Sequence, residues 1–134
     1  MGSEGVAIGS SPLSSLMINM PFIQDYWPMV ALLLWFGYKW WSARRVMALL
    51  PKLKGEGAIL LDVRSQAEFA SGNAPGTRNI PLNVLGRHLG SIPKTFPVVV
   101  GCASGTRSGM AKLMLKKKGY QRVYNIGAWR NFMS

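Results

Sequence analysis

Three consecutive valines at positions 98–100 are the strongest strand signal in this chain of 134 residues. Valine is branched at Cβ and favours extended backbone, and an unbroken apolar run is typical of a strand buried on both faces of a parallel sheet. Further strand signals at 58–63 and 122–126 alternate with helix signals, which are a capping-box spacing from Ser65 to Glu68 and a helical stretch at 108–118. This order predicts an α/β domain with a mainly parallel sheet flanked by helices.

Charged and apolar residues lie on different parts of the chain. Lys and Arg number 16 and Asp and Glu 5, for a net charge of +11, yet 49% of the residues are hydrophobic. That hydrophobic content excludes a disordered basic tail. Residues 42–134 carry a net charge of +12 and residues 1–41 a net charge of −1. One cysteine and one histidine exclude a disulfide framework and leave little for a metal site, so we expect no metal and no cofactor.

The segment 21–41 is the apolar part of the chain. No charged residue lies between Asp25 and Lys39, and the run 29–36 is apolar on all sides, without a helical stripe. As a helix the segment would be about 30 Å long, the thickness of a bilayer core, with Tyr and Trp at both ends. We therefore expect a transmembrane helix at 21–41, preceded by a flexible segment at 1–20. A buried core helix or a helix on the membrane surface is the alternative.

Basic residues follow the apolar run at 29–36 and none precedes it in the sequence: Lys39, Arg44, Arg45, Lys52 and Lys54 come after it. The positive-inside rule then puts the N-terminus outside and the C-terminal domain in the cytoplasm, in a single-pass protein of the inner (plasma) membrane. Residues 42–57 are expected to form a basic juxtamembrane linker or helix beside anionic lipid. The lipid bilayer is thus an expected partner. A homodimer formed through the aromatic-rich helix is compatible with the sequence. Nucleic acid is not expected, because no aromatic-and-basic motif accompanies the charge.

Cys102 directly follows the central strand, at the sheet edge where parallel sheets bind ligands. Small residues come next, so the backbone N–H groups can turn inward as an anion nest, and the following helix adds the positive end of its dipole. Arg107 adds a full positive charge. Together these groups favour the thiolate, which predicts a nucleophile of lowered pKa. We name Cys102 as the catalytic residue and the rest of the loop as substrate-binding: Ala103, Ser104, Gly105, Thr106 and Arg107.

The loop 102–108 resembles the active-site loop of rhodanese-domain sulfurtransferases. The segment 61–69 is similar to the first strand and helix of that family, and 72–81 is similar to its G-H-I-P-G-A-x-N-I-P segment. The three segments occur in the family's order. The resemblance implies a rhodanese-like domain at 58–134, with Ala103 at a position that the family often fills with arginine.

The resemblance implies a sulfurtransferase, and the apolar segment at 21–41 would make it membrane-anchored. The Cys102 thiolate would take the sulfane sulfur of thiosulfate or a persulfide, and cyanide or a thiol acceptor would then remove it. One alternative is a catalytically weak binding or scaffold module at the membrane. Another is a phosphatase-like or arsenate-reductase-like cysteine enzyme, whose loops have one residue more between Cys and Arg than the four found here. Asp62 and Arg64 are expected to form a structural pair that braces the end of the sheet.

Overall fold

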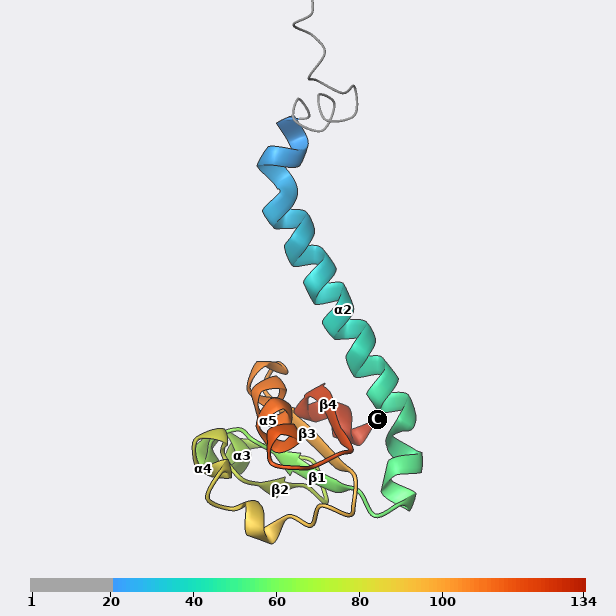
Figure 1. Cartoon of the computed structure of the whole chain (residues 1–134), viewed down its shortest axis with the longest axis vertical. Coiled ribbons are helices and arrows are strands. Elements are labelled where there is room, and N and C mark those ends of the chain that lie inside the picture. Colours follow the sequence, from blue (N-terminus) through green and yellow to red (C-terminus); the bar gives the residue numbers. More distant parts are fainter. Residues whose placement is uncertain (1–20) are drawn as a thin grey trace, which may run out of the picture. The chain divides into compact units, whose positions relative to one another are not determined.

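The computed structural model describes residues 21–134, with side chains from residue 23 onward (Figure 1). The chain divides into two units, one ending at Gly37 and the other covering Tyr38–Ser134. Helix α2 (Pro21–Gly55) supplies the described residues of the first unit and opens the second. One helix therefore covers both the predicted apolar segment and most of the predicted basic linker. The flexible segment predicted at 1–20 lies outside the described residues.

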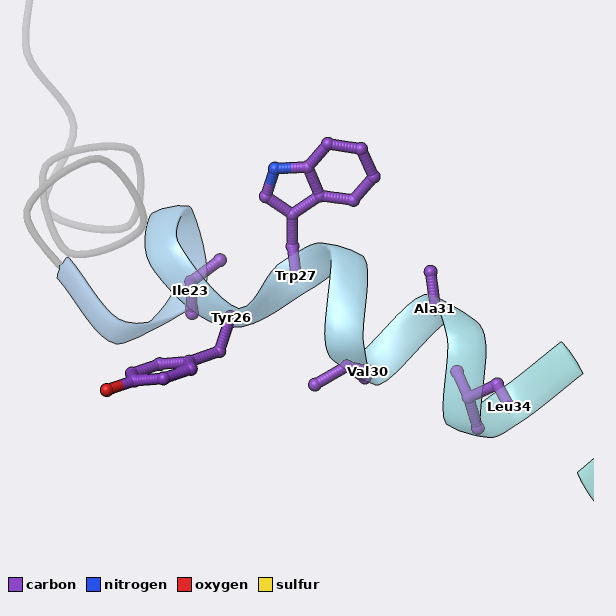
Figure 2. A pocket seen from close by; sticks show the side chains of 6 residues that line it. All are labelled: Ile23, Tyr26, Trp27, Val30, Ala31 and Leu34. Atoms are coloured by element: carbon purple, nitrogen blue, oxygen red, sulfur yellow. The ribbon is translucent and has the colours of Figure 1, made fainter. Parts of the chain in front are cut away.

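The first unit exposes its large apolar side chains. Leu33 and Leu34, for example, are 65% and 69% exposed. A shallow apolar hollow of about 330 Å³ lies along this part of α2, and Figure 2 shows its lining side chains leaving the helix in different directions, with Trp27 and Ala31 on one side. The phenol of Tyr26 is the only ionisable group among the six lining residues, so the hollow offers little for catalysis.

The structure does not support the predicted transmembrane helix at 21–41. Within the described part of the chain, no helix is both long enough and apolar enough to span a bilayer. The physical reason is the short length of the strongly apolar run, which covers only residues 29–36. Polar Gln24 and Asp25 precede this run and Lys39 follows it, and the aromatic residues around it carry polar ring atoms.

The second unit is built on a four-stranded parallel sheet in the order β2-β1-β3-β4. Its strands are β1 (Ile59–Asp62), β2 (Arg78–Asn79), β3 (Val98–Cys102) and β4 (Val123–Ala128). All five residues of β3 are buried, as expected for a central strand with both faces covered. The predicted α/β fold with a parallel sheet is confirmed.

Helices lie between the strands and after the last one in the chain (Figure 1). They are α3 (Gln66–Ser71), α4 (Leu82–Leu85), α5 (Thr106–Lys117) and the 3₁₀ helices η2 (Leu89–Ser91) and η3 (Trp129–Met133). The predicted capping box is present at α3: the side chain of Ser65 accepts from the backbone of Glu68, and the Glu68 side chain accepts from the backbone of Ser65. This box fixes the position of the Glu68 carboxylate near the end of β1.

Side chains of β3 alternate between two hydrophobic clusters, one on each face of the sheet. Val98, Val100 and Cys102 enter a cluster with residues of α4 and α5. Val99 enters the other cluster, together with Phe132 of η3 and with Val46, Leu50 and Leu53 of α2. The C-terminal part of α2 is therefore a packed layer of the domain, in the segment where the sequence predicted a basic juxtamembrane linker or helix.

Candidate active site

Cys102 ends β3, and hydrogen-bond donors surround its Sγ atom. The backbone N–H of Gly105 donates to Sγ at 2.9 Å, and both the backbone N–H and the hydroxyl of Ser108 lie 3.4 Å from it. The residue is only 1% exposed. The sulfur thus lies in a ring of donors suited to a negative charge.

The pKa of the Cys102 thiol lies below its ordinary value. Burial is the largest single influence and raises the pKa, but it is outweighed by the hydrogen bonds from the side chain and backbone of Ser108 and from the backbone of Gly105 and Ser104. The first turn of α5 follows directly and adds its positive dipole end. The loop therefore favours the nucleophilic thiolate.

Gly105 gives the loop its shape. Its φ of 102° lies in the left-handed region, which glycine adopts at low cost. A Cβ at this position would also lie 3.2 Å from Cα of Gly127 at the end of β4. The positive φ and the close approach both favour glycine. The turn that glycine allows here points the Gly105 N–H at the sulfur. Ala103, Ser104 and Thr106 are exposed, and Ser104 acts on the sulfur through its backbone.

Asn125 holds the loop from β4. Its Oδ1 accepts from the Ser108 hydroxyl at 2.7 Å and from the Gly127 N–H at 3.0 Å, while its Nδ2 donates to the Gly105 carbonyl at 3.1 Å. The single proton of the buried Ser108 hydroxyl therefore has two acceptors in reach, Asn125 Oδ1 and Cys102 Sγ. Neither Ser108 nor Asn125 was predicted as a site residue from the sequence. The one available signal was the amide side chain of Asn125 within an otherwise apolar strand.

Arg107 pairs with Glu68 across the mouth of the loop. Nη1 and Nη2 of Arg107 lie 2.7 and 2.9 Å from the two carboxylate oxygens. The Arg107 hydrogen bonds, followed by the backbone hydrogen bond of Ser65, lower the pKa of Glu68 to about 2. The same pairing raises the pKa of Arg107. Arg107 also borders a hollow of about 390 Å³ that is lined by Val63, Ser65, Pro81, Leu82 and Asn83.

Asp62 and Arg64 form a buried ion pair at the end of β1. They are 0% and 4% exposed, and Nη2 of Arg64 lies 2.8 Å from Oδ2 of Asp62. Arg64 also donates to the carbonyls of Glu68 and Gly72 at 3.2 and 2.7 Å, and its guanidinium lies over the ring of Trp129. These contacts tie the end of β1 to α3 and to the residue that follows it, which is the geometry of a brace.

Comparison with known proteins assigns the second unit. The sequence pattern of the rhodanese-like domain family matches residues 46–134. A protein from Allochromatium vinosum named sulfurtransferase is 38% identical over 71 residues, which make up 53% of this chain and 66% of that protein. The thiosulfate sulfurtransferase GlpE of Stutzerimonas stutzeri is 26% identical over 83 residues, 59% of this chain and 76% of that protein.

A solved structure is similar in both fold and sequence. The structure titled rhodanese with anions, from E. coli, superimposes with a TM-score of 0.51 and is 33% identical, over 55% of this chain and 89% of that one. The matched region spans just under two thirds of the Allochromatium vinosum protein. The family match covers the sheet, the Cys102 loop and the part of α2 that packs on the sheet. The chain belongs to the rhodanese-like domain family.

Proposed function

We propose that this chain is a sulfurtransferase that carries a sulfane sulfur on Cys102. The observation that carries the proposal is a cysteine of lowered pKa inside a ring of N–H and O–H donors at the end of the central strand. Such a ring stabilises negative charge on sulfur without a separate general base. Relatives named sulfurtransferase and thiosulfate sulfurtransferase support this chemistry.

The first step is nucleophilic attack on a donor such as thiosulfate. The Cys102 thiolate forms a bond to the outer sulfur, the S–S bond of thiosulfate breaks, and sulfite leaves with the electron pair. The product is a Cys102 persulfide with its negative charge on the terminal sulfur. The N–H groups of Gly105 and Ser108 contact Sγ, the atom to which the terminal sulfur is bonded, and the first turn of α5 adds its dipole.

The second step regenerates the enzyme. Cyanide or a thiolate attacks the terminal sulfur, the Cys102 S–S bond breaks, and the electron pair returns to Cys102 as thiolate. The products are thiocyanate or a new persulfide, and no external oxidant is needed because one S–S bond replaces another when the acceptor is a thiol. The donors that favour the thiolate make it a good leaving group in this step.

The test uses the single cysteine of the chain. Purified protein treated with thiosulfate is expected to gain the mass of one sulfur atom, to lose it on adding cyanide, and to release thiocyanate in turnover. Cys102→Ser should gain nothing, while Leu113→Ala, a change in an exposed side chain of α5, should behave as wild type. Failure of the wild type to gain sulfur from thiosulfate or a small persulfide would leave the alternative of a binding module.

We also propose that the first unit associates with a lipid bilayer. Its exposed side chains include Leu32, Leu33, Leu34, Trp35 and Phe36, and contiguous apolar surface of this kind marks protein or membrane contacts. Basic Arg44 and Arg45, which follow in the sequence, would favour anionic lipid. The protein should float with vesicles containing phosphatidylglycerol, and replacing Leu33 and Leu34 with Asp should abolish flotation. Wild-type protein that stays at the bottom of the gradient would contradict the proposal.

A further inference from the structure

One basic residue of α2 lies beside the catalytic loop. Tyr38 and Trp40 are 64% and 62% exposed, whereas Lys39 between them is half-buried. Lys39 lies on the same helical face as Ala43 and Val46, at spacings of four and three residues. Because Val46 is part of the buried core, this face is the one that packs on the domain. Lys39 is the last residue of that face toward the N-terminus of the second unit.

The packing brings the Lys39 ammonium to the Cys102 loop. A Cβ placed at Gly105 would lie 3.7 Å from Nζ of Lys39, and a Cβ placed at Gly127 would lie 3.4 Å from Cβ of Ala43. Gly105 is the residue whose N–H donates to Sγ of Cys102 at 2.9 Å. One turn of α2 therefore lies against the loop and the end of β4, with its cationic group next to the residue that contacts the sulfur.

The basic side chain of the loop itself is bound to a carboxylate. Arg107 is the one basic side chain among residues 102–107, and the Glu68 carboxylate binds it through two hydrogen bonds. The pair carries no net charge, and Ala103 adds none. Lys39 brings a second cationic group to the loop, and its ammonium lies next to Gly105, whose N–H contacts the sulfur.

We propose that Lys39 is a specificity-determining residue that favours small anionic sulfur donors over neutral ones at Cys102. The proposal rests on the proposed sulfur transfer for the identity of the donor. The role of Lys39 is to attract and orient the anion, so its charge acts on binding and leaves the bond-breaking step to the loop. A guanidinium at this position would do the same, and a neutral side chain of equal length would not.

The first test separates binding from chemistry with thiosulfate as donor. Lys39→Met is expected to raise the KM for thiosulfate about fivefold in low salt, with kcat within about twofold of wild type. Lys39→Arg should restore the KM, and the wild-type advantage should shrink in high salt because the charge is screened. Lys117→Met removes the same charge at the C-terminal end of α5 and serves as the matched control. A loss confined to kcat, or an unchanged KM, would overturn the proposal.

The second test does not depend on sulfur transfer. Iodoacetate and iodoacetamide alkylate the same thiolate but differ in charge, so the ratio of their rates measures the local attraction for an anion. Lys39→Met, and Lys39→Gln where the methionine variant fails to fold, should lower this ratio about threefold. A changed ratio in a protein that forms no persulfide would sink the sulfurtransferase function and leave the Lys39 inference standing. Normal sulfur loading of the wild type, together with a ratio that Lys39→Met leaves unchanged, would refute the Lys39 inference and leave the sulfurtransferase function standing.

Discussion

Arg107 and Glu68 are 39 positions apart in the sequence, yet both guanidinium Nη atoms of Arg107 donate to the Glu68 carboxylate. Glu68 also closes the capping box of α3. One carboxylate therefore joins the start of α3 to the first turn of α5, and it holds the mouth of the Cys102 loop in place. The contribution of this ion pair to stability can be tested by varying the pH.

Glu68→Gln should remove the pH dependence that the pair imposes. The folded pKa of Glu68, about 2, lies below the ordinary carboxyl value of 4.5, so the pair stabilises the fold fully above the ordinary value and loses this effect as pH falls toward 2. The melting temperature of wild type should exceed that of Glu68→Gln at pH 6, and the difference should vanish between pH 4.5 and 2. A constant difference across that window would show that Glu68 acts through its shape and not through its charge.

Ser108→Ala should raise the pKa of Cys102. The substitution removes the hydroxyl that, among the groups lowering this pKa, has the largest effect, and it leaves the backbone N–H in place. The rate of iodoacetamide alkylation plotted against pH should shift its midpoint upward, toward the ordinary thiol value. Ser104→Ala, whose side chain is exposed, provides the comparison and should leave the midpoint unchanged. Equal midpoints in all three proteins would contradict the role given to the Ser108 hydroxyl.

Gly101→Ala should destabilise the domain by overpacking. A Cβ at this position would lie 2.6 Å from the ring of Phe132, closer than packed atoms approach, at an expected cost of about 1–3 kcal/mol. Urea unfolding measures the loss, and Phe132→Leu in the same chain should recover part of it. Gly86→Ala is the control, since its backbone is helical and no atom lies near the added methyl. Equal stability of the two alanine variants would refute the close approach.

Arg64→Met should lower the free energy of unfolding of the domain without a direct effect on sulfur loading. The substitution leaves the fully buried Asp62 carboxylate without its partner, which costs about 3–5 kcal/mol. Asp62→Asn combined with Arg64→Met should cost less than the two single changes together, because no buried charge remains. Persulfide formation per folded molecule should match wild type. A specific loss of loading in folded protein would assign Arg64 to the chemistry.

Leu50→Ala tests whether α2 belongs to the domain. Leu50 is fully buried against the sheet, so its truncation should cost about 2–5 kcal/mol. The neighbouring Leu49 is 38% exposed, and Leu49→Ala should cost well under half as much. Chemical denaturation of the two variants makes the comparison. Equal losses would mean that this part of the helix does not pack as described.

The sequence predicted the sheet well because its signals are local. The valine run at 98–100 and the apolar run at 58–63 fall on β3 and β1, and the Ser65 capping box lies where it was expected. These features depend on residues that are near one another in the chain. The same holds for the Cys102 loop, whose glycine, small residues and helix start all follow the strand directly.

Interactions between distant segments could not be predicted in this way. Asn125 and Lys39 reach the loop from β4 and α2, and no spacing within the sequence connects either residue to Cys102. The core face of α2 was not predicted either, because the apolar residues Val46 and Leu50 stand among basic residues in the sequence. The transmembrane prediction relied on the length of the segment and the charges around it. A bilayer-spanning helix also has to be apolar over its whole length, and α2 is not.

The hydroxyl proton of Ser108 links the charge on the Cys102 sulfur to the side chain of Asn125. Its hydroxyl can donate to Sγ of Cys102 or to Oδ1 of Asn125, but not to both at once. A negative sulfur draws the proton toward itself, and a sulfur that is protonated or alkylated releases it to the amide. The carboxamide resonances of Asn125 in a nuclear magnetic resonance spectrum should therefore move with the charge on the sulfur. Loading and discharge of the cysteine would then be visible without any label or reporter group.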